Sequence, residues 1–344
     1  MLFAMAVAVV LAVVAGAAAV ALGVGPFARA AAGSVVYVAI SRSTDESDAR
    51  EIEAIDLAAG TRELFDAGGR ITSLVVSADR RSLYVAVDGG RVVFLDATTG
   101  TRFAEVHLHG PTITSLVPTP DGRTLYAITA TNVLSSVVPI DLDGRKAGDP
   151  LVLPAGAGTA VLRGDALIVA IADPRSLQVI FVSTSKLSVT DRLILPRGSL
   201  AAPLVLRVSD ARTAVVVFDP SGFGGGSIRV YLVADATHWE DVALPAPFGI
   251  GTQRGQPVVV GAASTAGAVH VCVPGGTGAR RYIVTPDRKS TVAGTECGPM
   301  TSGAGGADIL LARRDPAQLL VLDPTTGRPT RTLPLAGVPA RLIR

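Results

Sequence analysis

The chain has 344 residues, of which 49% are hydrophobic and 17% charged, and its formal net charge at pH 7 is +2. That apolar share supports a large folded core and excludes a mostly disordered chain. The near-neutral charge argues against nucleic-acid binding, which requires a concentrated basic face.

The N-terminal 32 residues differ from the rest of the chain. Residues 2–24 carry no charge and exceed the ~20 residues that span a bilayer. Residues 28–30 and 30–32 fit a small-x-small cleavage site, whereas the length of the apolar run favours an anchor. We therefore assign residues 1–32 to a signal peptide or an N-terminal transmembrane anchor. Both alternatives place the domain at 33–344 outside the cytoplasm, either secreted or attached to the membrane.

The domain contains an internal repeat. The sequence Ile-Thr-Ser-Leu-Val at residues 71–75 recurs at 113–117, and Tyr84 and Tyr126 share the same offset. A period of about 40–45 residues with short apolar runs is typical of the four-stranded blade of a β-propeller.

Six blades can be read from four short segments each, and blade 2 shows the pattern most clearly. The outer strand of blade 2, at 102–108, alternates between apolar and polar residues, as expected for a half-exposed strand. The predicted strands are 71–77, 82–87, 91–96 and 102–108 in blade 2; 113–118, 124–129, 136–141 and 151–153 in blade 3; 159–163, 166–171, 177–182 and 189–195 in blade 4; 203–208, 213–218, 227–233 and 239–244 in blade 5; 257–262, 268–273, 281–285 and 290–292 in blade 6; and 299–303, 307–312, 318–323 and 328–333 in blade 7.

Blade 1 lacks an inner strand in its own part of the chain. Its predicted strands are 35–40, 51–56 and 61–65, whereas residues 338–344 at the other end of the chain look like an inner strand. Pairing them closes the ring and removes unpaired strand edges. The sequence thus predicts an all-β fold, a seven-bladed β-propeller closed by its C-terminal strand and preceded by an N-terminal apolar helix.

The turns support this prediction. In three blades an Asp is followed four residues later by Gly: Asp56 and Gly60, Asp96 and Gly100, Asp323 and Gly327. The Asp side chain can cap the turn, and Gly accepts the positive φ.

Two segments carry a family resemblance. Residues 119–127 resemble the Ser-Pro-Asp-Gly-x-x-Leu-Tyr-Val-Ala hairpin of YVTN-type propellers, and residues 92–100 resemble their Val-x-Val-Ile-Asp-x-x-Thr-Gly strand and turn. The chain is therefore similar to YncE-like, YVTN-family seven-bladed propellers over about residues 34–344. The resemblance implies an extracytoplasmic propeller and implies no particular activity.

The only two cysteines, Cys272 and Cys297, are a disulfide candidate. Cys272 ends the predicted second strand of blade 6, and Cys297 opens the inner strand of blade 7. In a propeller these two strand ends lie on the same face, and an exported domain tolerates a disulfide. The alternative is two buried thiols.

The sequence offers no catalytic motif. It contains no Gly-x-Ser-x-Gly elbow, phosphate loop or zinc signature, so we expect no catalytic residue, metal or cofactor from motifs. His107 and His109 share a strand face but are predicted to be solvated, and His270 is expected to be a hydrogen-bonded core residue.

Four aspartates are candidate ligand-binding residues: Asp88, Asp173, Asp219 and Asp315. Each follows the second strand of its blade, so all four are expected at the same end of the ring, near the mouth of the channel. One interpretation is that Asp only begins each turn. The other is an acidic rim that attracts a cation or a cationic ligand.

We expect a binding or scaffold protein whose small ligand or protein partner lies against the loops at 41–50, 172–176, 219–226, 245–255 and 313–316. The alternative is a propeller enzyme, either a lactonase-like hydrolase or a quinoprotein-type dehydrogenase subunit. A lactonase-like site would require a cluster of Glu, Asn, Asp or His at the channel mouth.

Overall fold

A computed structural model describes residues 34–108, 111–131, 133–172, 176–195, 203–219, 227–244, 261–265, 267–273, 279–285, 287, 289–302 and 308–343. Within these ranges no helix has the length and apolar character needed to cross a bilayer. The predicted signal or anchor at 1–32 lies outside them.

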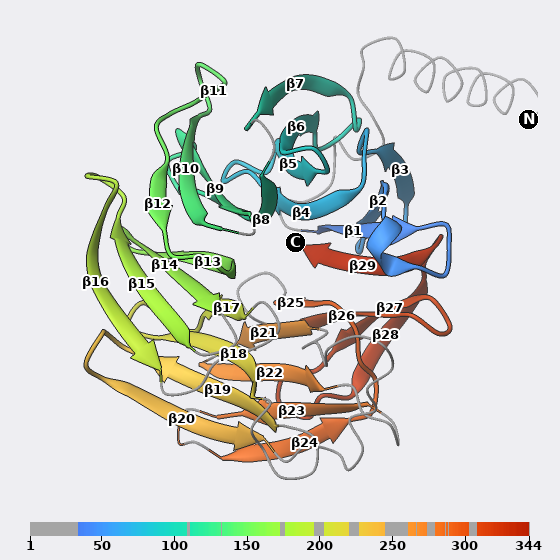
Figure 1. Cartoon of the computed structure of the whole chain (residues 1–344). Coiled ribbons are helices and arrows are strands. Elements are labelled where there is room, and N and C mark those ends of the chain that lie inside the picture. The colour runs from blue at the N-terminus through green and yellow to red at the C-terminus, as the bar shows by residue number, and fades with distance from the viewer. Residues whose placement is uncertain are drawn as a thin grey trace, which may run out of the picture.

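The described strands form seven antiparallel sheets in a ring, and the fold is a seven-bladed β-propeller (Figure 1). From the channel outwards, the strands are β29 (Val338–Ile343), β1 (Val35–Ser41), β2 (Glu51–Asp56) and β3 (Arg62–Asp66) in blade 1; β4 (Ile71–Val76), β5 (Ser82–Val87), β6 (Arg91–Asp96) and β7 (Arg102–His107) in blade 2; β8 (Thr112–Pro118), β9 (Thr124–Ala130) and β10 (Ser135–Asp141) followed by β11 (Lys146–Ala147) and β12 (Leu151–Leu153) in blade 3; β13 (Ala157–Arg163), β14 (Ala166–Ala172), β15 (Leu177–Ser183) and β16 (Ser188–Leu195) in blade 4; β17 (Leu204–Arg207), β18 (Thr213–Asp219), β19 (Ser227–Val233) and β20 (Trp239–Leu244) in blade 5; β21 (Gly261–Thr265), β22 (Ala268–Val273), β23 (Arg280–Val284) and β24 (Ser290–Gly294) in blade 6; and β25 (Met300–Ser302), β26 (Ile309–Arg313), β27 (Gln318–Leu322) and β28 (Pro329–Pro334) in blade 7.

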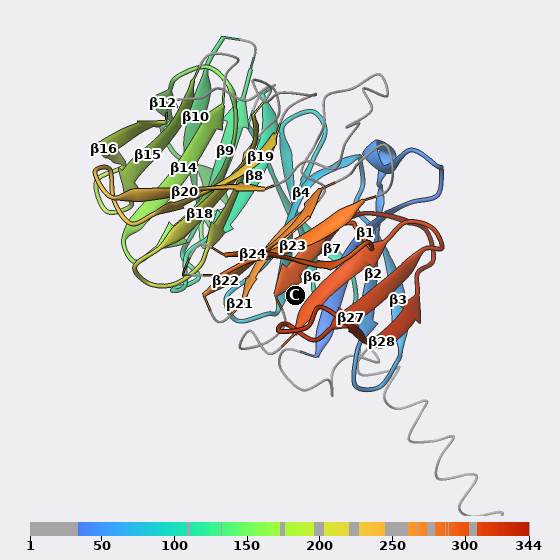
Figure 2. The same ribbon diagram turned by 90° about the horizontal axis from the view of Figure 1, so that it is seen from below.

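The predicted ring closure is confirmed. Strand β29 pairs antiparallel with β1, with Leu342 opposite Val38 and Ile343 opposite Tyr37. Blades 1 and 7 consequently lie side by side in both views (Figures 1 and 2) and share one apolar cluster that includes Val38, Leu310 and Leu342. Closure therefore links the two ends of the described chain through both backbone pairing and a common core.

The core lies between neighbouring blades. Along β5, Leu83 and Val85 face the cluster shared with blade 1, whereas Tyr84 and Ala86 face the cluster shared with blade 3. This follows from the two-residue period of a strand, which is buried on both faces here. Full burial of a valine or leucine contributes about 1.5–3 kcal/mol, so each shared cluster holds adjacent blades together.

Two predicted segments differ from the structure. The inner strand of blade 6 continues to Thr265, beyond the predicted end at 262, because Gly267 adopts a φ of 83° in a tight turn that pairs Thr265 with Ala268. Residues 257–260, where the prediction begins, lie outside the described part. Blade 3 has an extra short strand, β11, and its outer edge is split, since Pro139 on β10 has no N–H for the ladder.

The Asp and Gly turns are confirmed. Asp96 Oδ1 accepts the N–H groups of Thr98 at 2.9 Å and Thr99 at 2.8 Å, and Gly100 has a φ of 67°. The turns that begin at Asp56 and Asp323 have the same arrangement.

The two faces of the ring carry different loops. The top face carries the connections between the second and third strands of each blade and the connections between blades. The bottom face carries the remaining hairpins and the start of β1 at Val35.

Candidate functional site

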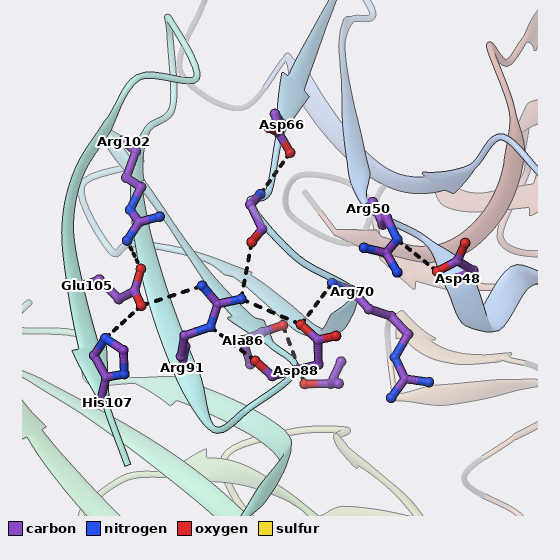
Figure 3. A network of polar contacts seen from close by, with 12 residues as sticks. Asp48, Arg50, Asp66, Arg70, Ala86, Asp88, Arg91, Arg102, Glu105 and His107 are labelled. Atoms are coloured by element: carbon purple, nitrogen blue, oxygen red, sulfur yellow. Dashed lines mark hydrogen bonds and ion pairs between the residues drawn. The ribbon is translucent and has the colours of Figure 1, made fainter. Parts of the chain in front are cut away.

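Asp88 lies on the top face in a polar network (Figure 3). Its Oδ1 accepts the backbone N–H of Arg70 at 3.2 Å and lies 3.6 Å from Nη2 of Arg91. Nε of Arg91 also donates to the backbone carbonyl of Asp88 at 3.2 Å. The carboxylate therefore binds the backbone of the connection between blades 1 and 2 and pairs with Arg91, and within the described residues it accepts no hydrogen bond from the turn that it begins.

A second carboxylate in this network, Glu105, was missed by the sequence analysis. Its side chain is only 9% exposed and contacts two arginines and a histidine. Nη1 of Arg91 lies at 3.6 Å and Nε2 of His107 at 2.8 Å, and Arg102 completes the cluster. The Glu-x-His spacing on one strand was the available signal, because residues two apart share a strand face.

His107 is therefore not a merely solvated side chain, since it contacts Glu105. His109 lies outside the described residues. With Glu105 and Asp88 both paired to Arg91, this part of the top face has little uncompensated negative charge.

The structure describes the other three predicted aspartates only in part. Asp173 lies outside the described residues, and for Asp219 the structure describes the backbone at the end of β18 and not the side chain. Asp315 lies in the turn after β26. The structure therefore does not bring the four carboxylates together, and a common cation site remains a prediction.

Asp315 instead lines a cavity of about 340 Å³ on the top face between blades 6 and 7. A volume of this size falls at the lower end of the ~300–1,000 Å³ typical of small-molecule sites. The lining residues are Ala279, Thr295, Glu296, Cys297, Arg313, Arg314 and Asp315.

One of the two cysteines, Cys297, lines this cavity. In the structure Cys272 and Cys297 are joined as a disulfide, with their Cα atoms 5.4 Å apart. The bond ties the segment between blades 6 and 7 to the end of β22. It therefore fixes the backbone next to Glu296, which also lines the cavity.

Charges of both signs meet in the cavity. Arg313 donates from Nη2 to Oε1 of Gln318, and its buried Nε has no hydrogen-bond partner. Arg314 donates to the carbonyl of Thr44 in blade 1 at 3.1 Å. Glu296 lies 3.9 Å from the buried Arg281. The site thus offers guanidinium donors and carboxylate acceptors to one small ligand.

The described residues provide no metal centre. No group of three His, Cys, Asp or Glu within them is arranged to hold a metal ion. The cluster of such residues that a lactonase-like metal site would require is therefore not found in this part of the chain.

No family model and no curated protein matches the sequence. The structure resembles the periplasmic gluconolactonase of Pseudomonas aeruginosa, with a TM-score of 0.66 and 16% identity over 90% of this chain and 98% of that one. It also resembles the hydrazine synthase of Kuenenia stuttgartiensis, with a TM-score of 0.68 and 14% identity over 83% of this chain and 95% of that one.

A third similar structure is the β-propeller domain of Cps50 (Swd1) from Myceliophteria thermophila. Its TM-score is 0.55, with 15% identity over 78% of this chain and 88% of that one. At such identities the likeness establishes the fold alone, since propellers host many unrelated functions. By fold this chain is a seven-bladed β-propeller.

Proposed function

We propose that this protein is an extracytoplasmic propeller that binds a small hydroxylated acid in the cavity between blades 6 and 7. The observation that carries the proposal is that two arginines, Arg313 and Arg314, line one small cavity together with the carboxylates Glu296 and Asp315.

The remaining lining groups fit the other half of such a ligand. Arginine matches a carboxylate through its planar array of donors. Glu296 and Asp315 accept hydrogen bonds from hydroxyl groups but repel a second acid. A ligand with one acidic group and several hydroxyls satisfies both sets, as a sugar acid does.

Two features support the cellular location that we propose: the apolar N-terminal segment, which lies outside the described residues, and the disulfide. The apolar segment at 2–24 is long enough for an export signal or a membrane anchor. The bond between Cys272 and Cys297 fits an oxidising compartment. We propose that the propeller lies outside the cytoplasm, anchored to the membrane if the segment is retained.

A lactone-hydrolysing enzyme is the second candidate, because a periplasmic gluconolactonase shares the fold over 98% of its length. In this alternative Glu296 or Asp315 would activate a water molecule for attack on a lactone carbonyl, and the product would be the hydroxylated acid of the first proposal. No observation on the described residues favours the quinoprotein-type alternative.

Calorimetric titration of the purified full-length protein with gluconate tests the binding proposal. We expect heat of binding that Arg313→Gln abolishes and that Arg328→Gln, an equal charge change at an exposed turn, leaves intact. No heat with gluconate, or equal effects of both variants, would reject the proposal. A pH-stat assay with glucono-δ-lactone then separates an enzyme from a binding protein.

A further inference from the structure

The inner strands of the ring have an unusual charge composition. Strands β29, β4, β8, β13, β17, β21 and β25 surround the channel (Figure 1), and within their described bounds none contains Asp or Glu. They carry several hydroxyl side chains and three arginines: Arg163, Arg207 and Arg341. The wall of the channel therefore holds positive charge without compensating carboxylates of its own.

Two of these arginines already have partners. Arg163, at the end of β13, donates to the carbonyls of Ala211 at 3.2 Å and Ala234 at 2.7 Å in blade 5. Arg207, at the end of β17, pairs with Asp210. Both side chains are accounted for by contacts at the bottom face.

Arg341 differs from them. It lies on β29, the strand that closes the ring, opposite Ala39 of β1. It has no hydrogen bond or ion pair with the part of the chain that the structure describes. The side chain is solvent-exposed, although surrounding protein atoms desolvate it enough to lower its pKa. Because β29 is the innermost strand of its blade, the guanidinium of Arg341 is exposed on the side of the blade that borders the ring axis.

We propose that the central channel binds a small oxyanion, a phosphate- or carboxylate-bearing molecule, at Arg341. A guanidinium presents several donors in one plane, which match the oxygens of either group. Walls of low dielectric constant strengthen the attraction, and no carboxylate of the inner strands competes for the cation.

This site is separate from the cavity between blades 6 and 7 and does not depend on the proposed function. Arg341 is on the innermost strand of blade 1, whereas the cavity is lined by loops of blades 6 and 7. The two sites can therefore be distinguished by variants of different arginines.

Calorimetric titration of the full-length protein with inorganic phosphate, and separately with acetate, at constant ionic strength is the test. We expect at least one probe to bind and Arg341→Gln to weaken its binding about tenfold or more. Arg341→Lys keeps the charge but loses the planar donors, so it should give an intermediate affinity. If Arg341→Gln does not melt cooperatively, Arg341→Lys supplies the comparison.

The matched control is Arg328→Gln, which removes an exposed arginine from a turn of blade 7 and should leave affinity unchanged. If Arg341→Gln and Arg328→Gln weakened binding equally, the loss would reflect only the change in net charge, and the proposal would be overturned. The proposal also fails if neither probe binds, or if Arg313→Gln abolishes binding while Arg341→Gln does not. Failure of gluconate binding at the cavity would not affect it.

Discussion

Thr159 and Val205 connect two neighbouring blades through one hydroxyl group. Thr159 Oγ1 on β13 accepts the backbone N–H of Val205 on β17 at 3.1 Å and donates to the carbonyl of Pro203 at 2.7 Å. Thr114 donates to the carbonyl of Gly158 in the same way, from blade 3 to blade 4. The inner strands are thus joined by side-chain hydrogen bonds as well as by the apolar clusters between blades.

Replacing this hydroxyl should destabilise the ring. Thr159→Val keeps the shape of the side chain but leaves a backbone donor and a backbone acceptor unpaired, which costs about 1–3 kcal/mol. Urea unfolding measures the difference in the free energy of unfolding. Thr112→Val is the control, because Thr112 is exposed and its substitution should change that free energy little. Equal effects of the two variants would contradict the proposed role of Thr159.

Removing the closing strand should destabilise all seven blades together. Deletion of 338–344 leaves β1 without its inner partner and exposes strand edges in blade 1. We expect a large fall in the melting temperature and loss of a single cooperative transition in calorimetry. Leu342→Ala, a milder change at a buried position, should cost about 2–5 kcal/mol. A truncated protein with an unchanged melting temperature would mean that closure contributes nothing to stability.

The ring and its closure were predictable because they follow from local patterns. Short apolar strands repeat in each blade and the Asp-x-x-x-Gly turn repeats in three of them, and an incomplete blade 1 requires a strand from elsewhere. The predicted end of the inner strand of blade 6, at residue 262, is too early, because the small residues at the end of β21 do not resemble a strand. The positive φ of Gly267 decides that register, and the sequence pattern does not reveal it.

The candidate sites were only partly predictable. The position of Asp315 after the second strand placed it on the top face, but the cavity it lines also requires loops from blade 6. Glu105 pairs with Arg91 across the neighbouring strands β7 and β6, and this pairing depends on the register of the two strands. The sequence places Arg341 only in the closing strand. Whether its side chain finds a partner depends on residues that the other blades bring near it in the folded ring, and the sequence pattern does not show these.

The disulfide should stabilise blade 6, which is the least regular blade by sequence. The bond closes a segment of 25 residues between Cys272 and Cys297, and the chain-entropy estimate for such a loop is roughly 3 kcal/mol. Reduction should lower the urea midpoint of the wild-type protein. A Cys272→Ala/Cys297→Ala variant should unfold near the reduced midpoint and be insensitive to reductant. Mass spectrometry of the exported protein provides a direct check, and two freely alkylated thiols there would exclude the bond.

His270 should make stability depend on pH in the mildly acidic range. The side chain is fully buried, and among the described residues neither ring nitrogen has a hydrogen-bond partner, so the expected core hydrogen bond is not found there. Burial, followed by the charge of Arg281, lowers the pKa of His270 to about 4. An unfolded histidine has a pKa of about 6.5. Between these values the unfolded chain binds a proton that the folded chain excludes.

The free energy of unfolding should therefore fall as the pH decreases from about 6.5 to about 4, and the contribution of His270 should be constant above this range. His270→Phe removes the titrating group and leaves no unpaired nitrogen in the core. Between pH 7 and pH 5 the wild-type protein should lose about 2 kcal/mol more than this variant. Urea unfolding at both pH values measures the difference. Parallel losses in the two proteins would show that His270 binds its proton equally well in the folded state.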